Sequence, residues 1–472
     1  MARAAPTVEL LTAHEAEERQ RRAAGALRDA GCRPGDRAAF CLSSSADLLC
    51  AVLGAARTGV VPVLLNPALT DAERSVQLDD ADPTVVVADR EGLHRLVGHP
   101  GRPAELAARP LTRSMHYTSG TTGRPKGVAS GLWDEATAAA VFDDEADLWE
   151  LDAADRHLVC SPMCHSVSIR FAAGTLLRGG SLVVLGRFDA PTALRALREL
   201  SPSTTFMVPT HLQRLLELRE LGTEEAFGSL RLLAHAGAPC PPALKRAALR
   251  RVRPGVLWEF YGSTEGQFTV CSPDEWLEHP GTVGRARPRR RLFLDASIGE
   301  GGVEMSATDD DTPVGTIWCQ VPPFARFEYW RDPEATAAAW RGHAFSVGDM
   351  GHLDRDGYLY LSGRRHDLII SGGVNVYPAE VEAVLAEVDG VREVAVFGMP
   401  DVAWGQRVCA AVVCRGELDQ AALRSAAAAS LAPYKRPKYY VQATELPRTV
   451  TGKLLRQQVP AHLGLSPGKT GS

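Results

Sequence analysis

The stretch HYTSGTTGRPKGV, residues 116–128, has the residue types of a phosphate-binding loop. Its glycines let the backbone approach an anion and turn its N–H groups inward, and its hydroxyls add donors. Lys126 adds a point charge suited to phosphate. The residues expected to bind phosphate are Thr118, Ser119, Gly120, Thr121, Thr122, Gly123 and Lys126. Such a loop could serve an enzyme that transfers the terminal phosphate, or one that discards pyrophosphate and keeps AMP.

The glycine spacing separates this loop from the most common phosphate loop, whose pattern is G-x-x-x-x-G-K-[ST]. Counted from Gly120, the second glycine comes too early, and Lys126 is followed by Gly127 instead of Ser or Thr. A solvated Gly/Ser/Thr loop is the alternative interpretation, but this combination of residues favours phosphate binding.

Together with five later motifs, the loop resembles the signature of the acyl-adenylate-forming (ANL) superfamily, which includes acyl-CoA synthetases, peptide-synthetase adenylation domains and firefly luciferase. The segments VGDMG and EWLEHPGTVGR (275–285) are similar to those of the acyl-CoA synthetase branch of AMP-dependent synthetases and ligases. The resemblance to the family runs from about Leu10 to Leu463. The motifs occur in the family's order: PMCHSVSIRFAAGTLLRGG (162–180), AHAGAP (234–239), FYGSTE (260–265), SVGDMGHLDRDGYLYLSGRRHDLIISGGVNVYPAEVE (346–382) and LPRTVTGKLLR (446–456).

The resemblance implies a nucleotide site for ATP, in which a flat aromatic face can stack on adenine. Glu265 is the expected Mg²⁺ ligand, because a carboxylate is a hard oxygen donor, and Thr264 is expected to donate to the α-phosphate. Asp349 would accept the ribose hydroxyls, and Arg364 would donate to ribose or phosphate. The remaining residues expected around the nucleotide are Gly237, Ala238, Pro239, Tyr261, Gly262 and Ser263.

Lys453, in TVTGK, is implied as the catalytic lysine of the first half-reaction. When a carboxylate attacks the α-phosphorus, negative charge collects on the bridging and α-phosphate oxygens. A cation aimed at those oxygens stabilises the transition state more than the ground state. His165, after PMC, is implied as a residue that gates the acyl pocket and the entry of the thiol.

The second half-reaction implied by the family is attack of the CoA thiol on the acyl-adenylate. The small C-terminal domain is expected to rotate about a hinge, which removes Lys453 and brings Ser371–Gly373 to a pantetheine tunnel. Gly372 and Gly373 have no side chains to block that tunnel. The acid pocket is expected near Val208, Pro209, Thr210, Gly262, Gln267 and Phe268. Arg170 could be a charge near that pocket or a surface residue, and we favour the surface interpretation.

The chain departs from the family pattern at three places. His366 stands at the hinge, where Asp or Lys is usual, and relatives generally begin a few dozen residues earlier. The segment 288–315 contains three successive arginines that are not typical of the family. The departures at the hinge and the N-terminus leave an alternative function open. In that alternative the chain is a family member that passes the adenylate to a carrier-protein thiol or an amine, which includes activation of nitrite and diazotisation of an arylamine. A degenerate relative that only binds nucleotide is a third possibility, against which Lys126, Glu265, Asp349 and Lys453 argue.

The pattern of secondary structure that must position these residues is α/β. Thr12 and Glu15 form an S/T-x-x-E capping box that predicts a helix over Thr12–Ala30. Short β-branched runs alternate with helices such as Pro191–Leu200 and His211–Leu221, which predicts parallel-sheet α/β layers, with a β-barrel-like subdomain implied by the family. Beyond about Asp349 the sequence predicts a hairpin and then a small α+β unit, which the resemblance to the family implies is mobile. We therefore expect an adenylation (AMP-binding) domain over residues 1–365 and a C-terminal domain over residues 366–472.

Composition places few constraints on the function. The chain has 472 residues, a net charge of −5 and 45% hydrophobic residues, so it is typical of a globular protein with no general affinity for nucleic acid or membrane. No apolar stretch has the length of a signal peptide or a membrane span, and a cytoplasmic location is expected. The ten cysteines contain no C-x-x-C pair and are expected to be reduced and mostly buried.

The family resemblance implies ATP, Mg²⁺ and CoA as cofactors and a small-molecule acid as the substrate. The chain is expected to be a monomer or a homodimer.

Overall fold

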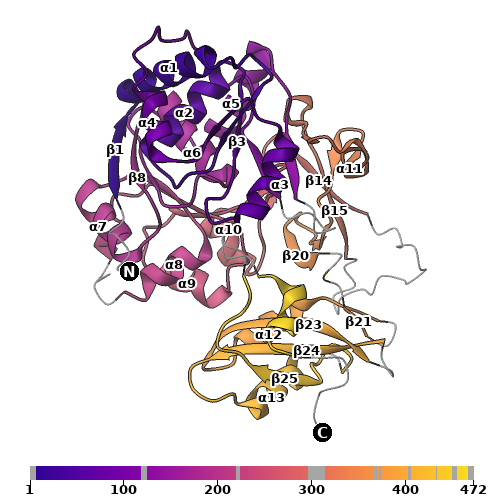
Figure 1. Ribbon diagram of the computed structural model, residues 1–472. Helices are drawn as coiled ribbons and strands as arrows, with labels where there is room; N and C mark the ends of the chain where they lie inside the picture. Colours follow the sequence, from indigo (N-terminus) through magenta and orange to yellow (C-terminus); the bar gives the residue numbers. More distant parts are fainter. Residues whose placement is uncertain are drawn as a thin grey trace.

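The computed structural model describes residues 7–118, 125–218, 224–295, 314–364, 367, 369–371, 374–401, 405–431, 433–448 and 454–465. The N-terminal elements form layered sheets and helices, and the C-terminal elements form a separate small unit next to them (Figure 1).

Two six-stranded sheets form the α/β part. In the first sheet every neighbouring pair is parallel except β1, which runs antiparallel to β8 at one edge. Its strands, in spatial order, are β1 (Val8–Thr12), β8 (Ser181–Leu185), β7 (Arg156–Val159), β9 (Thr204–Met207), β10 (Leu232–His235) and β11 (Leu257–Glu259). The predicted parallel-sheet layers are therefore confirmed.

The second sheet is parallel over β5, β3, β2 and β4, and ends in two antiparallel strands. Its order is β16 (Glu328–Tyr329), β6 (Lys126–Ala129), β5 (Met115–Thr118), β3 (Val61–Leu64), β2 (Arg37–Phe40) and β4 (Val85–Val87). Strands β5 and β6 carry the two ends of the expected phosphate loop. The sheet therefore fixes where the loop leaves and re-enters the fold.

Helices pack between and outside these sheets. Helix α2 (Ala46–Arg57) packs on β3, α6 (Ser166–Leu177) packs on β7 and β8, and the two helices contact each other, so they lie between the sheets. Every residue of α2 except Asp47 is buried, as expected for a helix that is apolar on all sides. The other helices of this part are α1 (Ala13–Asp29), α3 (Asp71–Ala81), α4 (Arg90–Val97), α5 (Glu135–Ala146), α7 (Ala190–Leu200), α8 (Pro209–Leu216), α9 (Pro242–Leu249), α10 (Pro273–Glu278) and the 3₁₀ turn η2 (Glu224–Phe227).

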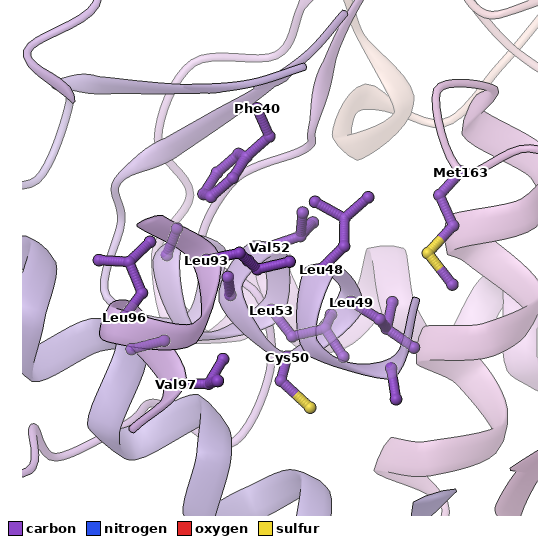
Figure 2. Packing of buried hydrophobic residues seen from close by; sticks show 14 of the residues in the cluster. Phe40, Leu48, Leu49, Cys50, Val52, Leu53, Leu93, Leu96, Val97 and Met163 are labelled. Atoms are coloured by element: carbon purple, nitrogen blue, oxygen red, sulfur yellow. The ribbon is translucent and has the colours of Figure 1, made fainter. Parts of the chain in front are cut away.

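The buried cluster around α2 joins helices and strands that are far apart in sequence. Figure 2 shows Leu48, Leu49 and Leu53 of α2 among Phe40 of β2 and Met163, which precedes α6. A core of this kind holds α2 and α6 in a fixed relation, and the cavity described below is bounded by both helices.

Leu49→Ala is expected to lower the free energy of unfolding by about 2–5 kcal/mol, because Leu49 is fully buried and truncation leaves a cavity. Leu10→Ala is the matched control, because Leu10 is 57% exposed on β1 and its truncation should change stability by no more than about 0.5 kcal/mol. Calorimetric unfolding of both variants measures the difference. Equal destabilisation by the two would contradict the assignment of this core.

An antiparallel sheet stands where the β-barrel-like subdomain is expected. Its path is β17 (Trp340–Arg341), β18 (Ala344–Phe345), β15 (Gly315–Gln320), β19 (Asp349–Leu353) and β20 (Leu359–Arg364), with β14 (Arg291–Asp295) beside β15. The predicted hairpin is β19–β20. The nearby short elements are β12 (Thr269–Val270), β13 (Arg285–Ala286), η3 (Pro323–Ala325) and α11 (Pro333–Ala339).

The C-terminal part is a small α+β unit, as predicted (Figure 1). Helices α12 (Pro378–Ala386) and α13 (Gln420–Ser430) contact each other, and α12 packs on the long strand β23 (Val391–Asp401). The other elements are β21 (Ile369–Ser371), β22 (Val374–Val376), β24 (Gly405–Cys414), β25 (Tyr439–Gln442), η5 (Arg456–Gln458) and α14 (Val459–His462). The proposed boundary at residues 365/366 lies outside the described residues.

Local sequence signals predicted the types of these elements correctly, but some predicted ends differ from the observed ends. The capping box of Thr12 and Glu15 is present, and α1 begins at Ala13. The helix predicted over His211–Leu221 begins two residues earlier, at Pro209, because proline fits the first helical turn, and α8 ends at Leu216. All ten cysteines are free, and most are buried. Among the described residues, no helix has both the length and the apolar character needed to cross a membrane.

Candidate active site

A cavity of about 150 Å³ lies between α2, α5, α6 and strands β5 and β6. The FYGSTE motif reaches it, because Thr264 and Glu265 are among the lining residues. Ser166, the first residue of α6, and His116 of β5 also line the cavity. Three of the sequence motifs therefore meet at one place.

The FYGSTE motif is held as a tight turn. The Ser263 N–H donates to the Gly266 carbonyl at 2.8 Å, and Gly262 forms an isolated bridge with Gln267. A Cβ at Gly262 would lie 2.8 Å from the Gly266 oxygen and the Gln267 Cα, so only glycine fits this close approach. The turn directs Thr264 and Glu265 to the cavity.

Glu265 is a buried carboxylate with one described side-chain partner. It is 5% exposed, and its Oε1 accepts a hydrogen bond from the Tyr329 hydroxyl at 2.9 Å. The second carboxylate oxygen has no donor within the described part of the chain. A buried carboxylate with one open oxygen fits a hard cation such as Mg²⁺.

Tyr261 and Asp349 form a buried pair. The Tyr261 hydroxyl donates to Asp349 Oδ2 at 2.6 Å, and their side chains are 8% and 9% exposed. The Tyr261 ring packs on Phe268 with 4.8 Å between centroids. The ring is therefore largely covered, and the role that the structure supports for Tyr261 is to hold Asp349.

The two ends of the phosphate loop lie side by side. The Thr118 hydroxyl donates to the Lys126 carbonyl at 3.4 Å. Lys126 Nζ lies 3.6 Å from Asp332 Oδ2 and 5.1 Å from the centre of the Tyr329 ring. Tyr329 thus touches both Lys126 and Glu265, which places the expected phosphate cation and the expected metal ligand around one ring.

His165 and His116 lie together at the start of α6. His165 is the N-cap residue of α6, and burial lowers its pKa. His116 Nδ1 lies 2.9 Å from the Cys164 carbonyl oxygen, so this nitrogen carries the proton and donates. Burial, with smaller contributions from His165 and nearby arginines, lowers the pKa of His116 to about 4. Both imidazoles are neutral at pH 7 and could gate a pocket without adding charge to it.

Several other residues that were expected around the nucleotide or the acid do not line the cavity. Gly237, with φ +89°, and Pro239 are exposed after β10, and Ala238 between them is half-buried. Of the residues expected around the acid, only Gln267 lines the cavity. Phe268 is instead a core residue, fully buried and packed against the rings of Tyr261 and Phe345.

The interpretation of Arg170 as a surface residue is wrong. Its side chain is 19% exposed, it pairs with Glu145 at 2.8 Å, and it lines the cavity. The sequence reasoning also missed Arg113, Glu145, Arg287 and Arg290, which share that wall. Two of these residues, Arg287 and Arg290, lie in the arginine-rich segment 285–291, which could have drawn attention to them. Nothing in the sequence indicates that this segment contacts α5.

Several expected site residues lie outside the described residues or are only partly described. The backbone of Arg364 pairs with Asp349 in the β19–β20 hairpin, but its side chain is not described. Those wholly outside are Ser119, Gly120, Thr121, Thr122, Gly123, His366, Gly372, Gly373 and Lys453.

Layered α/β sheets, a small C-terminal α+β unit and these motifs define the adenylate-forming class of enzymes. The family model for AMP-binding enzymes matches residues 3–114 and 112–300, and the model for their C-terminal domain matches residues 380–453. The chain therefore belongs to the AMP-binding enzyme family, in the acyl-CoA synthetase branch of the ANL superfamily, and it is an ATP-dependent, AMP-forming ligase.

Individual relatives support this placement over almost the whole chain. A 2-succinylbenzoate–CoA ligase of Bacillus licheniformis is 32% identical over 467 residues, which cover 94% of this chain and 93% of the relative. The crystal structure of ATP-bound MatB from Rhodopseudomonas palustris superposes with a TM-score of 0.82 at 29% identity, covering 95% of this chain and 93% of MatB. The structure of the amide bond synthetase McbA of Marinactinospora thermotolerans superposes with a TM-score of 0.81 at 27% identity, and the match covers 95% of this chain and 94% of McbA.

Tyr261→Phe is expected to raise the KM for ATP by about 2- to 10-fold, because Asp349 loses a hydrogen bond of about 0.5–1.5 kcal/mol that fixes its orientation. Initial rates at varied ATP measure the effect. The matched control is Tyr360→Phe, whose hydroxyl donates to Asp354 at 3.4 Å in the β19–β20 hairpin. The role of Tyr261 in positioning Asp349 would be wrong if both variants kept the parental KM.

Proposed function

We propose that this chain activates a carboxylic acid with ATP and then transfers the acyl group to the thiol of CoA. In the first step a carboxylate oxygen bonds to the α-phosphorus of ATP, and the bond to the bridging oxygen breaks, so pyrophosphate leaves. In the second step the CoA sulfur bonds to the acyl carbon, the bond to AMP breaks, and the thiol proton passes to solvent. The observation that carries the proposal is the opening of the cavity onto Thr264 and Glu265.

The described residues support separate roles around that opening. Thr264 would donate to the α-phosphate, Asp349 would hold the ribose, and Lys126 would contact the β- and γ-phosphates. Glu265 is the residue that would hold Mg²⁺, and the ion when bound would supply positive charge at the phosphates. His116 and Ser166 line the cavity beyond Thr264, so the acid would lie on that side, and His165 beside them would gate it.

The C-terminal unit would act in both steps. In this proposal residues 1–365 form the adenylation domain and residues 366–472 form a mobile domain that carries Lys453 into the first step. Rotation about the hinge at His366 would then bring Gly372 and Gly373 to the thiol path. We place the enzyme in the cytoplasm as a monomer or homodimer, which light scattering distinguishes.

The test is incubation of the purified protein with ATP, Mg²⁺ and a panel of acids, with and without CoA. We expect release of pyrophosphate with an accepted acid, and formation of its acyl-CoA only when CoA is present. Pyrophosphate release without acyl-CoA for every accepted acid would refute the thioester step. Unchanged ATP with every acid would refute the activation step.

An amine is the second candidate acceptor, and the similarity to the amide bond synthetase McbA favours it. The adenylate and its residues stay the same, while an amine nitrogen replaces the CoA sulfur. Adding a panel of amines, and a carrier protein bearing a phosphopantetheine thiol, to the assay separates the acceptors. Amide formation that is faster than acyl-CoA formation at equal acceptor concentrations would identify the amine as the preferred acceptor.

A further inference from the structure

One wall of the cavity carries more positive charge than any step of the proposed function uses. The lining includes the arginines Arg113, Arg170, Arg287 and Arg290 and the carboxylates Asp144, Glu145 and Glu265. Arginine is seldom buried without a carboxylate or phosphate partner, because an unpaired charge loses its hydration. The partner of each arginine therefore shows which charge is left for a ligand.

Three of these arginines share two carboxylates of α5. Arg290 lies 2.8 Å from Asp144, Arg287 lies 3.0 Å from Asp144 and 3.2 Å from Glu145, and Arg170 lies 2.8 Å from Glu145. Burial alone would raise the pKa of Glu145, but Arg170 and Arg287 outweigh it and lower the pKa to about 2. Glu145 is thus ionised, and both carboxylates are occupied by arginines.

Arg113 has no such partner. Its only described side-chain hydrogen bond runs from Nη1 to the backbone carbonyl of Glu265 at 3.3 Å. No carboxylate in the described part of the chain lies within ion-pair distance of it, and the carboxylate of Glu265 itself accepts from Tyr329. Arg113 keeps partial exposure because it faces the cavity, and yet burial and the neighbouring Arg170 lower its pKa to about 10. At pH 7 the guanidinium remains charged, and at the cavity it has no ion-pair partner among the described residues.

The rest of the lining limits the shape of a ligand. Apolar side chains from several elements complete the walls, among them Leu53, Trp133, Phe142 and Phe345. A volume of about 150 Å³ holds a body of about the size of benzene. The cavity therefore suits a short or single-ring hydrocarbon body.

We propose that the acid activated by this chain carries a second anionic group, and that Arg113 binds it. The class is a small dicarboxylic acid, one carboxylate of which reaches Thr264 for activation while the other pairs with the Arg113 guanidinium. A planar guanidinium can take a carboxylate in two parallel hydrogen bonds, which gives this pairing both strength and direction. The inference rests on the proposed activation of an acid and adds the class of that acid.

The first experiment compares matched acids with the unaltered enzyme. Each diacid, such as succinate, glutarate and phthalate, is paired with its half-amide, which has the same shape and one charge fewer. Acid-dependent pyrophosphate release gives kcat/KM for each. We expect at least one diacid to exceed its half-amide by roughly 100-fold or more, because a site built for a charged group is left unpaired by the neutral analogue. Equal values within every pair, or activation of nitrite with no activation of any diacid, would overturn the inference.

The second experiment removes the charge of Arg113. Arg113→Gln should lower the preference for the diacid by about 10- to 100-fold, mainly through the KM of the acid, while the KM for ATP stays the same. Arg113→Lys should restore part of the preference. Arg178→Gln is the matched control, because Arg178 is another partly buried arginine beside α5, where it pairs with Asp143 at 3.1 Å, but it does not line the cavity. An Arg113→Gln enzyme that keeps the full preference would overturn the inference.

A binding measurement separates this inference from the proposed function. Calorimetric titration of the preferred diacid into the enzyme without ATP should show binding that Arg113→Gln weakens and Arg178→Gln does not. If monoacids are activated but diacids neither bind nor react, the inference fails and the proposed function stands. If no acid releases pyrophosphate while the diacid still binds through Arg113, the proposed function fails and the anion site stands. If Arg113→Gln does not fold, the diacid and half-amide comparison and Arg113→Lys decide.

Discussion

Replacing Lys453 by alanine is expected to lower the rate of acyl-AMP formation by about 100- to 1,000-fold, the loss typical when one donor to a developing anion is removed. The proposed reaction concentrates negative charge on the α-phosphate and the bridging oxygen only as the carboxylate attacks. The affinity for ATP should therefore change little, while kcat falls. Single-turnover pyrophosphate release measures this step.

The same variant should form the thioester from supplied acyl-AMP at a rate near that of the unaltered enzyme, because the second step has no departing pyrophosphate. Lys438→Ala is the control, since Lys438 belongs to the same C-terminal unit and donates to the Pro433 carbonyl at 3.5 Å. An equal loss in both half-reactions of Lys453→Ala would refute this division of labour, and an equal loss in Lys438→Ala would indicate a general effect on the C-terminal unit.

The fold was predictable where local signals and tertiary packing agree. The capping box at Thr12, the alternation of strands and helices and the Asp-Gly hairpin after Asp349 each specify an element from neighbouring residues. The ends of α8 were not predicted correctly, because a proline that begins a helix looks the same in the sequence as a proline that ends a strand.

The meeting of Thr264 and Glu265 at one cavity was predictable for a different reason. FYGSTE is a contiguous motif whose tight turn places Thr264 and Glu265 together, so its sequence carries its geometry. The partner of Glu265 was not predictable, because Tyr329 comes from a strand 64 residues further along the chain. Contacts at that separation depend on sheet order, which the sequence pattern does not give.

The arginine-lined wall of the cavity was the least predictable part of the site. Arg113, Arg170 and Arg287 come from three segments that the sequence shows no reason to join. Carboxylates of α5 pair with Arg170 and Arg287, whereas Arg113 contacts the backbone carbonyl of Glu265. The sequence favoured a surface position for Arg170. Its partner Glu145 belongs to a different helix, so only the packing of α5 against α6 reveals the pair.

Glu265→Gln is expected to raise the Mg²⁺ concentration for half-maximal pyrophosphate release by about 10- to 100-fold and to lower the maximal rate. The substitution keeps the shape of the side chain and lets the amide oxygen accept from the Tyr329 hydroxyl, which donates to Glu265 at 2.9 Å. It removes only the negative charge and one oxygen ligand. Varying Mg²⁺ at saturating ATP and acid measures the activity, and binding of Mn²⁺ with a non-hydrolysable ATP analogue measures the metal site directly.

Tyr329→Phe separates the metal role from simple support of the carboxylate. It removes the donor to Glu265 but keeps the ring beside Lys126, so we expect a smaller shift in Mg²⁺ dependence, of about 2- to 10-fold, with the charge of Glu265 still present. If Glu265 only braced the loop, the two variants would shift the Mg²⁺ dependence equally. If Glu265→Gln left both the Mg²⁺ dependence and Mn²⁺ binding unchanged, the buried carboxylate would serve the fold, and the phosphates would depend on Lys126 and Lys453 for their charge.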